Sequence, residues 1–111
     1  MDIIENKNGD VVVLKLIGRL DTNTSQSLSD KAIGLIDGGL NKLVLDLAEL
    51  NYISSAGLRV LLMLAKKLKS IGGKVALASL QDNVKEVFEL SGFSSIFESF
   101  PGVSEATASF N

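Results

Sequence analysis

Cysteine and histidine are both absent from this 111-residue sequence. Without thiols there are no disulfides and no thiolate zinc sites, and without imidazole there are no histidine-based triads or proton shuttles. Carboxylates, lysines, hydroxyls and backbone groups remain. These groups can bind a partner, be modified or hold magnesium, but they seldom catalyse a reaction unaided. We therefore expect a binding module rather than an enzyme, with no cofactor and no resident metal.

Aromatic residues and long apolar runs are also scarce. Five Phe, one Tyr and scattered basic residues at a formal net charge of -2 provide neither a phosphate-tracking patch nor a base-stacking platform, so we expect no nucleic-acid partner. The longest apolar run, Val60 to Ala65, is far too short to span a bilayer, and the first residues lack the layout of an export signal. These features predict a cytoplasmic protein without direct membrane contact.

The apolar content predicts one domain over residues 1–111. A hydrophobic fraction of 46% is enough for one core, and the chain is too short for two ordinary domains. Ile3, Ile4 and the alternating run Val11–Ile17 flank Asn8-Gly9, a dipeptide typical of tight turns, and predict a β-hairpin. Polar capping residues and helical spacing then predict a helix that ends at Gly38-Gly39.

Later segments repeat a strand-then-helix pattern. The expected elements are a buried strand at Leu43–Leu47, a polar turn at residues 51–57, a helix up to Gly72-Gly73, a strand at Lys74–Ala78, a helix carrying Val84, Val87, Phe88 and Leu90 and ending at Gly92, a short edge strand around Phe93, Ile96 and Phe97, and a last helical turn at Val103–Ala108. This order predicts an α/β domain: a mostly parallel mixed sheet of four to five strands, an N-terminal hairpin and three to four packed helices.

The start of the helix after residue 53 is the strongest candidate for a functional site. A helix N-terminus favours negative charge, so Ser54 and Ser55 stand where a phosphate could be bound or carried, although either serine could simply cap the helix. Helical spacing assigns Leu58, Leu61, Leu62, Ala65 and Leu68 to the core and places Ser55, Arg59, Met63 and Lys66 on another face. The Asp21 loop should lie at the same sheet edge, and Asp46 is interpreted as structural.

Two motifs stand out in the sequence: Gly18-Arg19-Leu20-Asp21, and the stretch from Leu45-Asp46-Leu47 through Tyr52-Ile53-Ser54-Ser55-Ala56-Gly57-Leu58. They resemble the STAS domain family, specifically the stand-alone bacterial anti-sigma factor antagonists, and the resemblance extends from Val11 to about Phe97. It implies the STAS fold. It also implies that Ser55 is phosphorylated by a partner that is both anti-sigma factor and kinase, and that Asp21 contacts this partner. Ser54 departs from the Asp that is common before the phosphorylated serine, and Arg59 departs from a common Gly.

The resemblance and the helix face together define a predicted partner-binding surface. Its members are Asp21, Thr22, Asn23, Ser54, Ser55, Ala56, Gly57, Leu58, Arg59 and Met63. The implied function is an antagonist that binds the anti-sigma factor while unphosphorylated, frees a sigma factor, and is restored by a serine phosphatase. Three alternatives stay open: an unmodified scaffold or regulatory subunit of a stressosome-like or lipid-transport complex, a nucleotide- or phosphate-binding module, and a serine hydrolase, which would lack a histidine base.

Overall fold

The sheet opens with the hairpin that the sequence predicts. In the computed structural model, which describes residues 1–110, β1 (Asp2–Asn8) pairs antiparallel with β2 (Val11–Leu20). Asn8 pairs with Val11, so the two loop residues are Gly9 and Asp10. Gly9 has a φ of +66°, a conformation that glycine adopts without a steric cost.

Three parallel strands complete the sheet, and each is reached through a helix. They are β3 (Lys42–Ile53), β4 (Lys74–Ala78) and β5 (Glu98–Phe100), and the strand order is β1-β2-β3-β4-β5. The connecting helices are α1 (Ser25–Asp37), α2 (Ser55–Ser70) and α3 (Asp82–Ser91), and α4 (Val103–Ala108) follows β5. The predicted fold class, a mixed α/β sheet with a hairpin at its start, is confirmed.

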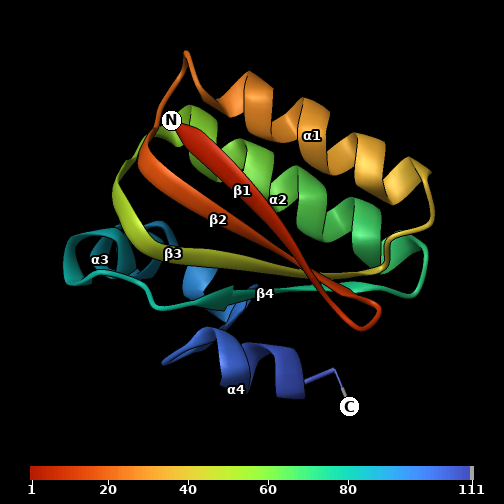
Figure 1. The fold of residues 1–111 in the computed structure, drawn as a ribbon. Coiled ribbons are helices and arrows are strands. Elements are labelled where there is room, and N and C mark those ends of the chain that lie inside the picture. Colours follow the sequence, from red (N-terminus) through yellow and green to blue (C-terminus); the bar gives the residue numbers. More distant parts are fainter. Residues whose placement is uncertain (111) are drawn as a thin grey trace.

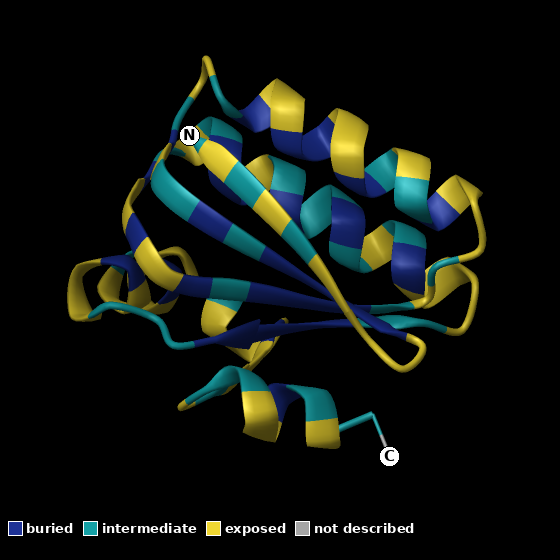
Figure 2. Ribbon diagram, in the orientation of Figure 1, coloured by how far each residue is buried: buried dark blue, intermediate teal, exposed yellow. Residues whose placement is uncertain are grey.

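Helices cover both faces of this sheet. Figure 1 shows α1 and α2 side by side on one face and α4 on the other. The larger core lies under α1 and α2 and includes Leu45 and Leu61, whereas a smaller cluster joins Val44 of β3 to Ala106 of α4. Because successive residues of a strand point to opposite faces, the run Leu43–Leu45 is buried on both, and Figure 2 shows the first half of β3 as mostly buried, with Lys42 and Asp46 only half-buried.

Several local predictions were wrong. The polar turn expected at residues 51–57 is absent, because residues 51–53 belong to β3 and residues 55–57 form the first turn of α2. Leu90 is 81% exposed although it was placed in the helical apolar pattern. Phe93–Ser95 form a 3₁₀ turn, and the edge strand comes later, at Glu98–Phe100. In α2, Leu64 is buried although the helical spacing did not assign it to the core, while Leu62 and Ala65, which were assigned to the core, are only half-buried. None of the helices in residues 1–110 combines the length and apolar character needed to cross a membrane.

Candidate functional site

The candidate site lies where β2 and β3 end together. β3 continues beyond Asp46, its last pairing with β4, and remains paired with β2 as far as the Leu20 and Ile53 partners. The backbone N–H of Ser54 then donates to the carbonyl of Leu20 at 2.9 Å. This bond joins the chain before α1 to the chain before α2, as the prediction of a shared sheet edge required.

Beyond Asp46, β3 no longer pairs with β4. Side chains at the start of α3 form hydrogen bonds to this part of β3 instead. The Gln81 amide donates to the carbonyl of Ala48, and the Asn83 amide donates to the carbonyl of Asn51, both at 2.8 Å. Asp46 accepts from the N–H of Ala48 at 3.1 Å, which supports its structural interpretation. These contacts hold the strand that leads into the serine pair.

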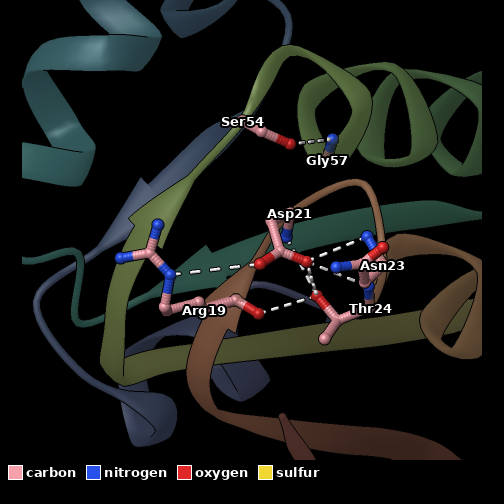
Figure 3. Close-up of polar contacts among 6 residues, drawn as sticks. All are labelled: Arg19, Asp21, Asn23, Thr24, Ser54 and Gly57. Atoms are coloured by element: carbon pink, nitrogen blue, oxygen red, sulfur yellow. Dashed lines mark hydrogen bonds and ion pairs between the residues drawn. The ribbon is translucent and has the colours of Figure 1, made fainter.

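Ser54 is the residue that caps α2. Its backbone is extended, with φ -94° and ψ 172°, and its Oγ accepts from the N–H of Gly57 at 3.1 Å (Figure 3). This is the geometry of an N-cap, in which a side-chain oxygen satisfies one of the free N–H groups of the first turn. Ser55 is therefore released from capping, and its side chain is exposed.

Gly57 brings the first turn of α2 against the end of β2. A Cβ atom on Gly57 would lie 2.8 Å from Cγ of Leu20, 2.9 Å from the Leu20 carbonyl oxygen and 3.0 Å from Cγ1 of Ile53. Real Cβ atoms essentially never come within 3.0 Å of such neighbours. Glycine is therefore required by space at this position, and it fixes where the two serines stand relative to the Asp21 loop.

The Asp21 loop forms its own hydrogen-bonded turn (Figure 3). Oδ1 of Asp21 accepts from the N–H of Asn23 at 3.0 Å and from the N–H of Thr24 at 3.1 Å. The Thr24 hydroxyl accepts from the N–H of Asp21 at 2.9 Å and donates to the carbonyl of Arg19 at 2.7 Å. The backbone N–H of Thr24 is the main cause that holds the pKa of Asp21 below its ordinary value.

Asp21 is thus committed largely to local structure. Its side chain is 29% exposed, and its Oδ2 lies 3.9 Å from Nε of Arg19. Thr22 and Asn23 are exposed beside it, so these two residues offer the more accessible part of the loop. The spacing Asp-x-x-Thr was the sequence signal for this turn, because Asp and Thr at that separation commonly satisfy nearby backbone N–H groups.

Arg19 and Tyr52 form a contact that the sequence reasoning did not assign. They are cross-strand partners on β2 and β3, and the guanidinium carbon of Arg19 lies 4.0 Å from the centre of the Tyr52 ring. Such a cation stacked on an aromatic face gains about 0.5–1 kcal/mol at exposed sites. Both residues stood in the quoted motifs, but their pairing depends on the extension of β3, which the sequence pattern did not reveal.

The remaining predicted residues differ in what they present to the surface. Arg59 is exposed, and Ala56 is half-buried. Leu58 is 8% exposed and belongs to the main core, so its side chain supports the fold rather than the surface. Met63 is half-buried and packs against the same core. Within residues 1–110, no three carboxylates gather closely enough to hold a metal ion.

Known proteins match this chain along most of its length. The model of the STAS domain family matches residues 3–106. BtrV of Bordetella bronchiseptica, named as a candidate anti-sigma factor antagonist, is 38% identical over 110 residues, which cover 99% of this chain and 95% of BtrV.

Solved structures share the same architecture. The crystal structure of a candidate anti-sigma factor antagonist from Thermotoga maritima superposes with a TM-score of 0.92 and 26% identity, covering 96% of this chain and 92% of that one. SpoIIAA of Bacillus, solved in its phosphorylated form, has a TM-score of 0.77 and 19% identity across 99% and 100% of the two chains. At that identity the second likeness concerns the fold alone.

Proposed function

The chain belongs to the STAS domain family, and from this premise we propose that it is an anti-sigma factor antagonist switched by phosphorylation of Ser55. In the unphosphorylated state it binds an anti-sigma factor that has serine kinase activity and thereby frees a sigma factor. Phosphorylation ends this binding, and a serine phosphatase restores it. The names of BtrV and of the Thermotoga maritima protein support the antagonist role.

The proposal rests on one observation: the two serines have different structural roles. Ser54 supplies the cap to the N–H of Gly57, whereas Ser55 is exposed as the first residue of α2. A kinase can therefore reach the Ser55 hydroxyl without breaking a helix cap. The Ser54 side chain does what an Asp would do at the N-cap, so the departure from the common Asp keeps the geometry and removes one negative charge.

The folded domain is well suited to tolerate a phosphate on Ser55. Within residues 1–110, the N–H groups of Ser55 and Ala56 have no backbone or side-chain acceptor, and the positive end of the helix dipole lies there. Arg59, one turn further along, is exposed. The phosphate adds about -1.5 to -2 charges at neutral pH, so an interface fitted to a hydroxyl would have to desolvate them. The switch then acts on the partner complex and leaves the fold intact.

The chemistry of the switch comes from the kinase. The Ser55 oxygen attacks the γ-phosphorus of ATP, the bond between that phosphorus and the bridging oxygen breaks, ADP leaves, and the hydroxyl proton passes to a base of the kinase. This chain contributes the acceptor oxygen and the docking surface. It is the substrate of the reaction rather than the enzyme.

A phosphorylation assay tests the acceptor. The chain is incubated with ATP and, separately, with each anti-sigma kinase of its own host, and the phosphate is mapped by mass spectrometry. We expect one phosphate on Ser55, none on Ser55→Ala, and retained phosphorylation of Ser54→Ala. Phosphate on Ser54 in the parent protein would overturn the assignment.

A binding assay tests the switch itself. Calorimetry with the same kinase should show that Ser55→Ala binds like the parent, while Ser55→Asp binds at least ten times more weakly. Thermal unfolding should show the phosphorylated domain within about 4 °C of the parent, because the helix-terminus effect is worth only about 0.3–1 kcal/mol. Equal binding by Ser55→Asp would contradict the charge switch, and binding without any phosphorylation would favour the scaffold alternative.

A further inference from the structure

A groove runs beside the C-terminal half of α2, at the far end of the helix from Ser55. Its cavity volume is about 490 Å³. The apolar part is formed by Leu62, Ala65, Val75 and Ile96, and three lysines, Lys66, Lys69 and Lys74, stand around it. We propose that this groove docks an acidic, amphipathic segment of the anti-sigma factor, so that partner contact extends along α2 from Ser55 to Lys69. This inference rests on the proposed function and names the chemistry of the partner.

One face of α2 connects the groove with Ser55 at the start of the helix. Residues 55, 59, 62, 66 and 69 are separated by four, three, four and three positions, the spacing that keeps side chains on one side of a helix. Ser55, Arg59, Lys66 and Lys69 are exposed, and Leu62 is half-buried between them. A partner that lies on Ser55 therefore meets the groove if its contact continues along the helix axis.

Charge on this face has a single sign. α2 contains Arg59, Lys66, Lys67 and Lys69 and no Asp or Glu, in a chain whose formal net charge is -2. Lys67 pairs with Asp37 of α1 at 3.6 Å, and Lys74 pairs with Glu98 at 3.3 Å. In residues 1–110, neither Lys66 nor Lys69 has an ion-pair partner. The groove thus presents two uncompensated cations beside apolar surface, which complement carboxylates and apolar side chains on one segment.

The lining favours a protein segment over a small anion. Small-molecule sites bury most of the ligand and orient it with a few well-placed polar groups. Here Ile96 is 50% exposed, and the cations that remain unpaired are on long, exposed side chains. Such a surface gains from contact area rather than from enclosure, as an amphipathic helix in a groove does.

Helix geometry predicts that the two ends of this surface act independently. With a rise of about 1.5 Å per residue, residues 55 and 66 are about 16 Å apart along the axis, beyond the screening length of about 8 Å at physiological salt. A negative charge at Ser55 therefore acts mainly on the partner near Arg59 and leaves the lysine end intact. Losses of affinity from changes at the two ends should multiply.

Calorimetry with the anti-sigma kinase that phosphorylates Ser55 tests the groove. We expect the double variant Lys66→Glu/Lys69→Glu to bind at least tenfold more weakly than the parent, with a shallower salt dependence. Lys7→Glu/Lys85→Glu changes the charge by the same amount on β1 and α3, where both lysines are exposed, and should stay within threefold. A variant that combines Lys66→Glu/Lys69→Glu with Ser55→Asp should bind more weakly than the parent by the product of the two separate fold-changes, within about twofold.

The outcomes separate the two proposals. If no host kinase binds the parent, the proposed function is wrong and the groove proposal ends with it. If the kinase binds and the groove variant binds equally well, while Ser55→Asp does not, only the groove proposal is wrong. It is also wrong if sedimentation shows a dimer of the parent that the groove variant loses, or if dodecanoate shifts the groove resonances in an NMR titration and the kinase does not.

Discussion

The substitution Gly57→Ala gives the sharpest test of how the site is held. The added methyl would meet the Leu20 side chain at 2.8 Å, the Leu20 carbonyl oxygen at 2.9 Å and the Ile53 side chain at 3.0 Å. One of these neighbours is backbone, and the other two are side chains of the main core, which are 0% and 4% exposed. None of the three can move aside freely, so the first turn of α2 must shift away from the end of β2.

The expected loss follows from two opposing terms. Overpacking in a well-packed region costs about 1–3 kcal/mol. Replacing glycine by alanine within a helix returns about 0.5–1 kcal/mol through reduced freedom of the unfolded chain. Values near the middle of both ranges give a net destabilisation of about 1–2 kcal/mol. For a domain of this size the unfolding entropy converts each kcal/mol into about 4 °C, so the Tm should fall by about 4–8 °C.

Urea denaturation and thermal scans of Gly57→Ala measure this loss, and Gly34→Ala is the matched control. Gly34 lies inside α1, where an added Cβ meets no atom of residues 1–110 within 4 Å. The same chemical change should therefore raise stability there by up to about 1 kcal/mol. If both variants are equally stabilised, the close approach at Gly57 does not hold α2 in place, and the packing argument fails.

Three further outcomes follow from single side chains. Ser54→Ala should lower the free energy of unfolding by about 1 kcal/mol, while Ser54→Asp, which can still cap, should change it far less; equal losses in urea denaturation would exclude the capping role. The folded-state pKa of Asp21 lies below its unfolded value, so its carboxylate stabilises the fold above about pH 4 and this contribution disappears as the pH falls through the folded pKa. The stability difference between the parent and Asp21→Asn should therefore shrink between pH 6 and pH 2.5, and a constant difference would contradict the turn geometry. Phe88→Ala should lower the free energy of unfolding by about 3–5 kcal/mol, since Phe88 is 2% exposed and packs edge-to-face on Phe97 with ring centres 5.6 Å apart. Leu90→Ala should change it by no more than about 0.5 kcal/mol, because Leu90 is 81% exposed. Similar losses for the two variants would place Leu90 in the core.

Strong local patterns made most of the architecture predictable. The apolar run Val11–Ile17 and the Gly9 turn were enough for the hairpin, although the expected alternation is absent from Val11–Leu14, which are all buried. The glycines after α1 and α2 marked where those helices end. The strand at Lys74–Ala78 was predicted with the bounds observed. In each case the hydrophobic period and a turn residue indicate the same boundary, and such agreement makes a sequence pattern reliable.

Where tertiary contacts decide the structure, the sequence pattern was insufficient. Residues 51–53 look like a polar turn, but pairing with β2 and the amide of Asn83 hold them as strand. β5 is Glu98-Ser99-Phe100, which has no apolar run of its own and forms because β4 offers a free edge. Leu90 lies at the end of α3, where helical spacing assigned it to the buried side, but no element within residues 1–110 covers it.

The charge that the site presents depends on which of its side chains are already hydrogen-bonded within the fold. The carboxylate of Asp21 is occupied by the N–H groups of its own turn, and Ser54 is occupied by the cap. In its first turns, the outer face of α2 still presents a neutral hydroxyl at Ser55 and the cation of Arg59. A phosphate of about -1.5 to -2 charges there exceeds that single positive charge. If Ser55 is phosphorylated as proposed, the sign of the surface at the start of α2 is reversed, and we expect an acidic partner to be repelled there.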